Sequence, residues 1–458
     1  MNRPTSLSSL LPAATLGLAL AVGAGPAPAA VDGVTGTSFA FDAQVGRVTT
    51  PDGSNLLMWG YACTSCASPD PNNVAQYPGP TLIVNQGDTV TVTLSNHLTL
   101  PPTATGAPVE AVPNVSIVFP GEDYVTASGG VVGSLTREAR PAGTTAPAVP
   151  DVVTYTFHAN RPGTFMYHSG TRQDLELEMG LFGAIVVRPS GYANRAYADA
   201  ATAFDREFLF VTSEMDPSIH LLIDAGLISQ VDNTTWYSTY WFFNGRAFPD
   251  TLAEANLPWM PNQPYNTAPR MHPGEQVLIR TVAAGREVHP FHHHGNHSRI
   301  VARDGRLLES APGAGPDRGY LVYSIPTYPG ETFDSIWSWT GEGVGWDLYG
   351  HKSTDPLQPG ECVFGGVVNR ANPLCDHGKP IPVTLPDQLS LHFGEFWSGS
   401  PYLGQLGALP PGQGRNNTTG GFFFMWHSHT EKEIVNNNVF PGGMLTMGVI
   451  EPPSVAIP

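Results

Sequence analysis

The chain has 458 residues, of which only 13% are charged, and its formal net charge of −17 makes nucleic acid an unfavourable partner. Its 50 glycines and 44 prolines separate many short β-rich runs, which favours an all-β architecture over a helical one. A chain of this length exceeds a typical single domain, so we expect two domains.

The first 29 residues have the pattern of a secretory signal peptide. Arg3 precedes the apolar run Leu10–Val22, and Ala27–Ala29 forms a small-residue cleavage site. Another apolar run of the ~18 residues needed to cross a bilayer is lacking, so we expect no membrane span. The mature chain is therefore expected in the periplasm or outside the cell, where cysteines are often oxidised.

Four cysteines fit such a compartment. Cys362 and Cys375 flank a loop that contains proline and asparagine, and a disulfide between them could close it. Cys63 and Cys66 form a Cys-x-x-Cys pattern, which indicates a small disulfide, a metal site or a redox site. In the sequence, none of the four lies beside a cluster of histidines.

Two strand patterns occur once in each half of the chain. A turn followed by an alternating strand at 85–94 is repeated at 272–280. Later in each half, the aromatic run at 163–170 is similar to the run at 421–428. The repetition predicts two β-sandwich domains of common ancestry.

We place the first domain at 31–190 and the second at 200–458. The second domain is longer because of an insertion at about 305–420, which is rich in glycine, proline and aromatic residues. Such a composition predicts a segment made mostly of loops.

Few helices are expected, and residues 216–228 are the best candidate. Asp174, Glu176 and Glu178 alternate a few residues after His168. Alternation of this kind places the three carboxylates on one strand face or in a loop, where they could reach a metal site near His168 or, more simply, face solvent.

Five of the 15 histidines lie within the nine residues His289–His297. On a strand, successive side chains point to opposite faces of the sheet. His292 and His294 are therefore expected to share one face, while His293 takes the other. His289 lies at the entrance of the same predicted strand.

A second pair, His427 and His429, brackets Ser428 near the C-terminus. The two imidazoles share one strand face, and the serine points to the other. Imidazoles at this density suit copper, zinc or iron, and burying several of them without partners would be costly. The two segments together predict a metal site, whereas the isolated His97 and His158 are better explained as structural residues.

With these motifs, the sequence resembles the two-domain multicopper oxidases of bacteria. The resemblance covers almost the whole mature chain, and it is strongest at residues 289–295 and 426–429. These read His-Pro-Phe-His-His-His-Gly and Trp-His-Ser-His, where the family has H-P-x-H-x-H-G and H-C-H. The resemblance implies two tandem cupredoxin-like Greek-key β-sandwich domains. In the family, a type 1 copper passes electrons through the cysteine of H-C-H to a three-copper cluster that reduces O2.

The set of cluster ligands that the resemblance implies is incomplete. In the family, eight histidines hold the three-copper cluster, and five of these positions keep a histidine here: His168, His292, His294, His427 and His429. Three positions in the first domain are taken by Val118, Pro120 and Gly170, and these side chains cannot bind a metal. The resemblance therefore implies copper as the cofactor, in a reduced site.

The type 1 copper site that the resemblance implies is altered further. His289 takes the position of its first ligand, and Ser428 replaces the cysteine. Glu433 falls where the second histidine would be, and Met444 matches the axial methionine across a lengthened loop. A hydroxyl does not form the copper–thiolate bond of a blue copper centre, so we expect no relay through Ser428. His289, Glu433 and Met444 remain secondary metal-binding candidates.

Four functions remain open for the five histidines. They could hold one or two copper ions that react with O2 or another small molecule, with electrons delivered directly by a substrate. They could instead bind or sequester copper without turnover. The fold could also be kept for structure or interaction alone. A zinc hydrolase, with Glu431 or Glu433 as base, is the fourth option.

Two-domain multicopper oxidases usually form trimers, with the copper cluster between the first domain of one subunit and the second domain of its neighbour. The resemblance therefore implies a homotrimer in which His168 meets the four other histidines across a subunit boundary. The expected partners are a small molecule or a metal ion, without nucleic acid.

Overall fold

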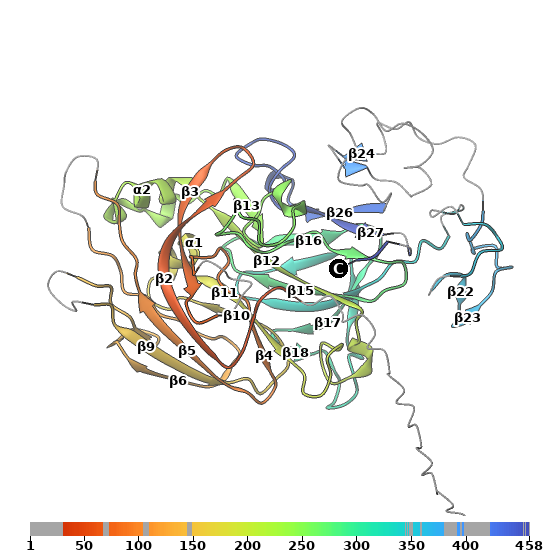
Figure 1. Cartoon of the computed structure of the whole chain (residues 1–458), viewed down its shortest axis with the longest axis horizontal. Coiled ribbons are helices and arrows are strands. Elements are labelled where there is room, and N and C mark those ends of the chain that lie inside the picture. The colour runs from red at the N-terminus through yellow and green to blue at the C-terminus, as the bar shows by residue number, and fades with distance from the viewer. Residues whose placement is uncertain are drawn as a thin grey trace, which may run out of the picture.

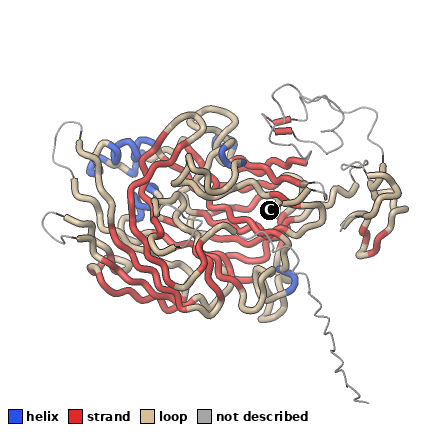
Figure 2. Tube along the Cα trace, viewed as in Figure 1, coloured by secondary structure: helices blue, strands red, loops and turns tan. Residues whose placement is uncertain are grey.

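The computed structural model describes residues 31–66, 73–103, 110–143, 149–343, 345, 347, 351–357, 360–379, 392–393, 396–397, 422–451, 453 and 455–457. The predicted signal peptide at 1–29 and part of the predicted insertion lie outside the described residues. Strands dominate, as Figure 2 shows, so the predicted all-β class is confirmed. Within the described ranges, no helix is long and apolar enough to cross a membrane.

The N-terminal half is a β-sandwich of two sheets. One sheet has the order β3–β2–β5–β9–β6, formed by Asn55–Cys63, Ser38–Thr49, Thr89–Asn96, Val152–His158 and Asp123–Gly129. The other has the order β1–β4–β11–β10, formed by Val34–Thr35, Leu82–Asn85, Phe182–Arg188 and Gly163–His168. Buried and partly buried residues alternate along β5 and β9, because only one face of their sheet packs against the core.

The C-terminal half has the same construction. Its larger sheet has the order β13–β12–β15–β21–β17–β18 with β19 beside β17, formed by Tyr240–Phe243, Arg206–Met215, Val277–Ala283, Thr332–Trp337, Ser298–Arg303, Arg306–Leu307 and Tyr320–Val322. The facing sheet has the order β14–β27–β26–β16–β20, formed by Arg270–Met271, Leu445–Ile450, Phe422–Ser428, His289–His293 and Ser324–Thr327. Three two-stranded sheets complete the described strands: β7 (Val131–Val132) with β8 (Arg137–Glu138), β22 (Val363–Phe364) with β23 (Val367–Val368), and β24 (His392–Phe393) with β25 (Phe396–Trp397).

The two halves pack directly against each other. Figure 1 shows the N-terminal strands in red to yellow beside the C-terminal strands in green to blue. Met58, Phe182 and Phe242 belong to one buried apolar cluster that draws on both halves. Across the junction, the Thr164 hydroxyl donates to Asp334 at 2.5 Å and Arg188 donates to Glu207 at 2.6 Å, and the buried Arg280 donates to both of these carboxylates.

The two α-helices are short. Helix α2 (Pro217–Asp224) falls within the predicted helical segment, and Asp216 caps it by accepting a hydrogen bond from the Ser218 backbone N–H. Single 3₁₀ turns add Ala200–Thr202, Ile228–Gln230, Asn233–Thr235, Asp250–Leu252 and Glu431–Glu433.

Helix α1 (Gln173–Met179) corrects the expected strand or loop after His168. Glu176 and Glu178 are buried rather than solvated. The Ser169 hydroxyl donates to Glu176, and the Trp236 indole N–H donates to Glu178 at 2.7 Å. The prediction of a solvated face was wrong for these two residues, because Ser169 and the distant Trp236 supply hydrogen-bond donors in the interior, whereas Asp174 is half exposed.

Both expected disulfides are present. Cys63 is bonded to Cys66, and Cys362 is bonded to Cys375. Of the roles that the Cys-x-x-Cys pattern allowed, the structure therefore shows the small disulfide. The domain boundaries near 190 and 200 and the limits of the insertion stay predictions.

Candidate metal centre

The candidate centre lies on two neighbouring strands of the C-terminal half. β16 and β26 are antiparallel, with His292 directly opposite His427 and Phe291 directly opposite Ser428. Because side chains alternate along a strand, His292 and His427 point to one face of the sheet, and Phe291 and Ser428 point to the other. The strand pairing therefore brings together two motifs that are separated by more than a hundred residues in the sequence.

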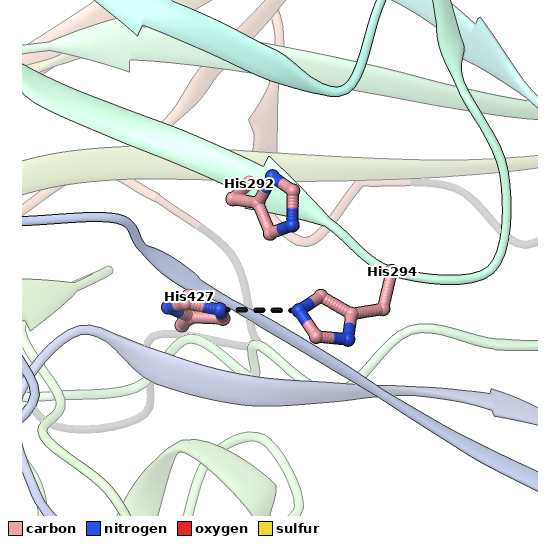
Figure 3. A group of neighbouring side chains, drawn as sticks. All are labelled: His292, His294 and His427. Atoms are coloured by element: carbon pink, nitrogen blue, oxygen red, sulfur yellow. Dashed lines mark hydrogen bonds between the residues drawn. The ribbon is translucent and has the colours of Figure 1, made fainter.

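Three histidines converge on the first face, as Figure 3 shows. Each of His292, His294 and His427 offers a ring nitrogen, and these nitrogens all lie within 4.8 Å of one another. Nε2 of His427 is 3.3 Å from Nε2 of His294. His427 is buried with 6% of its surface exposed, whereas the other two rings are more accessible. We name these three residues the histidine cluster.

His429 adjoins the histidine cluster. Its ring centroid is 4.8 Å from that of His292 and 5.5 Å from that of His427. Its Nδ1 lies 3.1 Å from Oε1 of Glu431, which is itself largely exposed. The four predicted ligands of the second domain thus lie in one place.

The ring nitrogens of the histidine cluster are held in a defined orientation. Nδ1 of His427 is 2.7 Å from the Ser428 carbonyl oxygen, to which it can only donate. Nδ1 of His292 is 3.0 Å from Oγ of Ser324, which lies directly opposite it on β20. When Nδ1 carries the proton, the lone pair of the same ring is on Nε2 and is free to bind a metal.

The environment of the histidine cluster favours neutral rings. Burial, followed by the neighbouring imidazoles, lowers the pKa of His427 to about 4. Burial and the nearby His294 and His429 also lower the pKa of His292, and burial and His429 lower that of His294. Metal ions bind the neutral imidazole, so these side chains are ready to bind at neutral pH without releasing a proton.

The corresponding place in the N-terminal half lacks these partners. His168 ends β10, and its Nδ1 lies 2.9 Å from the Ser169 carbonyl oxygen, as in His427. Among the described residues, the groups of three or more potential ligands close enough to share an ion do not include His168. Val118 pairs with His168 by its backbone, and a Cβ on Gly170 would lie 2.7 Å from a methyl of Val118. Two of the three positions at which the resemblance implies a histidine, Val118 and Gly170, are therefore packed against each other.

The opposite face of β16 and β26 holds a different arrangement. Nδ1 of His289 is 2.8 Å from Oε2 of Glu433, and Nε2 of His289 is 2.8 Å from Oε2 of Glu214. The Ser428 hydroxyl also donates to Oε2 of Glu433. All four residues are buried. We name them the His289 network.

The His289 network makes His289 a cation. Burial by itself would lower the pKa of His289, but the hydrogen bonds to Glu214 and Glu433 raise it to about 9. Both ring nitrogens then donate to carboxylates, so neither has a lone pair for a metal. The serine in place of cysteine belongs to the same hydrogen-bonded group.

The secondary metal candidates thus have other roles in this structure. His289 and Glu433 lie together, as hydrogen-bonding partners of each other. Met444 is fully buried and packs into the apolar core beside Phe291 and Trp426. Sequence reasoning missed Glu214, although an acidic residue inside the apolar strand β12 was a usable signal.

His293 confirms the predicted alternation along β16. Its ring lies 4.4 Å from that of Phe291 and 4.6 Å from that of Trp426, within the core on the face opposite the histidine cluster. Nδ1 of His293 lies 2.7 Å from the Ser298 hydroxyl. Burial lowers its pKa to about 3, so His293 is a neutral structural residue.

Comparison with known proteins gives a curated relative and solved structures of similar fold. A search against protein-family models finds no match. Among curated proteins, a probable nitrite reductase–hydroxylamine oxidoreductase fusion protein of Kuenenia stuttgartiensis is 25% identical over 331 residues. The match covers 70% of this chain but only 31% of that protein, so the chain spans about a third of the relative's length.

Solved structures of copper oxidases share the fold. The multicopper oxidase mgLAC superimposes with a TM-score of 0.50 and 16% identity, covering 94% of this chain and 88% of the other. A blue copper oxidase from Nitrosomonas europaea gives a TM-score of 0.50 and 17% identity, covering 90% and 85%. The chain therefore has the two-domain cupredoxin fold of multicopper oxidases, as the resemblance of its motifs implies.

Proposed function

We propose that this protein binds copper at the histidine cluster and exchanges electrons there directly with a small molecule. The observation that carries the proposal is the convergence of three neutral imidazoles on one face of β16 and β26, with their ligand atoms within 4.8 Å. His429 is the fourth candidate ligand. Copper bound there would supply one-electron redox chemistry.

The choice of copper is supported by the donors and by the relatives. Imidazole nitrogens without thiolate or carboxylate suit copper, zinc, iron or nickel. The names of the structures that share the fold describe copper oxidases. Among the described residues, the histidine cluster contains no carboxylate that would shift the preference towards harder cations.

The His289 network argues against an electron relay through Ser428. A type 1 site would need Ser428, His289 and Glu433 to release one another and bind an ion. Instead, the protonated His289 and its two carboxylates satisfy one another in a buried place. Electrons would therefore reach the histidine cluster from solvent, through the accessible side of His292 and His294.

Nitrite is the first substrate to test, because the name of the curated relative includes a nitrite reductase. O2 is the second, because the fold is that of multicopper oxidases. Binding or sequestering copper without turnover would use the same residues, and it would show as stoichiometric copper without activity towards either substrate.

Metal analysis and electron paramagnetic resonance of protein from copper-supplied cells test the proposal. We expect about one copper ion per chain, as three imidazoles complete one site, with a spectrum that lacks the type 1 signal. A His292→Ala, His427→Ala double variant should lose this copper. A His97→Ala variant, which changes an exposed histidine paired with Asp42, should keep it. Equal copper in the double variant and the wild type would contradict the proposal.

Export and assembly are also proposed. The signal-like N-terminus and the two disulfides support a periplasmic or extracellular protein. A homotrimer would give His168 a role, because it could then approach the histidine cluster of a neighbouring subunit. Cell fractionation tests the location. Light scattering of the wild type tests the trimer, and a monomer would contradict it.

A further inference from the structure

A second cluster of ligand-type side chains lies in the loop-rich segment between β21 and β26. His351, Glu361 and His377 each offer one ligand atom, and the three atoms lie within 4.8 Å of one another. We propose that these residues form a structural zinc site, separate from the histidine cluster. The hairpin β22–β23 of the same segment lies at the edge of the molecule in Figure 1, away from both sandwiches.

The distances between the side chains are close to those that zinc requires. Nδ1 of His377 is 3.0 Å from Oε2 of Glu361, and Nδ1 of His351 is 3.5 Å from Oε1 of Glu361. A tetrahedral zinc ion with bonds of ~2.0–2.1 Å holds its ligand atoms roughly 3.3 Å apart. The two imidazole rings are stacked, with centroids 4.5 Å apart. Small side-chain adjustments would therefore suffice to complete the site.

His377 gives independent evidence for a ligand. Only 1% of its side chain is exposed, yet neither ring nitrogen makes a hydrogen bond with suitable geometry in the described structure. The nitrogen near Glu361 has the distance of a hydrogen bond but not its direction. A buried imidazole without a hydrogen bond is costly, and a metal ion would satisfy it.

The backbone around the cluster is already fixed by a covalent link. Glu361 precedes Cys362, and His377 follows two residues after Cys375, so the disulfide between these cysteines holds both ligands near each other. Asp347 also approaches the ring nitrogen of His351 that faces Glu361, with Oδ1 3.2 Å from Nδ1, so this side of the cluster is rich in carboxylate oxygens.

The donor set and its setting favour zinc in a structural role. Two imidazoles and a carboxylate are typical zinc ligands. The segment has short strands, and Val367 and Val368 on β23 are exposed, at 66% and 58%. A small unit with little apolar core gains stability from disulfides and metal ions. Zinc binding would therefore stabilise this segment rather than take part in the redox chemistry of the histidine cluster.

Zinc titration of the full-length protein tests the site. The His292→Ala, His427→Ala variant serves as the background, because it removes competing binding by the histidine cluster. After metal removal, we expect this variant to bind one zinc ion per chain in competition with a chelating dye. Adding Glu361→Gln, which keeps the shape but removes the charge, should weaken zinc binding at least tenfold. Adding His377→Ala should abolish it, whereas adding His97→Ala should leave it unchanged.

Two further measurements separate the outcomes. Non-reducing peptide mapping of each variant should show the Cys362–Cys375 disulfide, so that lost binding is not attributed to misfolding. In an otherwise wild-type chain, His377→Ala should keep its copper, so a failure of the zinc site and a failure of the proposed function are distinguishable. No zinc in the background variant, or equal zinc affinity with and without His377→Ala, would overturn the proposal.

Discussion

The two faces of the β16–β26 pair carry the same kind of side chain in opposite states. On one face, His292, His294 and His427 are neutral and point their nitrogens at a common place. On the other, His289 is a cation held between Glu214 and Glu433. The protonation states differ because the imidazoles on the two faces have different neighbouring side chains. Imidazoles that face one another lose their protons, whereas an imidazole that faces carboxylates keeps its own.

The two faces differ in what an ion would add to them. The His289 network satisfies its own charges, so that face of the sheet is complete without an ion. The histidine cluster has nitrogens directed at one another, and a metal ion would replace that contact with bonds. Four changes to single residues would sharpen or break this contrast.

The largest effect is expected from Glu433→Ala. This change removes one of the two carboxylates from the buried His289 and the acceptor of the Ser428 hydroxyl. Breaking a buried ion pair in this way costs about 3–5 kcal/mol of unfolding free energy. Denaturant unfolding measures the loss, and Glu431→Ala, which changes an exposed carboxylate two residues away, is the control. A loss no larger than that of the control would show that the network is not charged.

The pH dependence of stability should report the same network. The pKa of His289 is raised to about 9, above its ordinary value near 6.5, so the folded state binds this proton more tightly than the unfolded chain. Its contribution is therefore fully present below pH ~6.5 and is lost as the pH rises through ~9, which amounts to about 3 kcal/mol.

Unfolding midpoints measured between these two pH values test the sign of that contribution. The wild type should lose stability as the pH rises, and a His289→Gln variant should show a flatter dependence. Equal slopes for the two proteins would mean that His289 is neutral in the folded state.

A smaller effect is expected from Ser324→Ala, which removes the hydroxyl beside Nδ1 of His292. Losing a group that orients a ligand typically weakens metal affinity by roughly 10–100-fold. The matched control is Ser298→Ala, because Ser298 contacts Nδ1 of His293 on the other face. Copper competition assays should separate the two variants. Equal affinity would place the copper elsewhere.

The smallest effect is expected from Ser428→Cys. Restoring the sulfur should give no strong absorption near ~600 nm with copper, because His289 and Glu433 still hold each other. Ser428→Cys combined with Glu433→His removes that obstacle and is the sharper comparison. A blue colour in the single variant would show that the His289 network opens readily for a metal.

The sequence predicted the features that depend on local periodicity. Alternation along a strand placed His292 and His294 on one face and His293 on the other, and the structure confirms both positions. The strand and turn pattern predicted an all-β fold, and the position of each cysteine pair allowed both disulfides. These inferences succeed because period 2 is a property of the backbone and is independent of distant partners.

Other features were decided by residues far away in the sequence. Glu214 approaches His289 from 75 residues earlier, because β12 crosses beside the entrance of β16. The Trp236 indole donates to Glu178 from 58 residues away, and Glu178 is buried although local alternation had indicated solvent. His377 likewise meets Glu361 because a disulfide draws the two ends of a loop together.

By itself, the sequence determined that two His-x-His pairs are present, and its resemblance to multicopper oxidases predicted that Ser428 stands at the position of their cysteine. Only the tertiary structure decided what each imidazole does. The physical reason is that the charge of a histidine depends on burial and on neighbouring groups within a few ångströms. Those neighbours come from strand pairing and domain packing, which bring distant residues together.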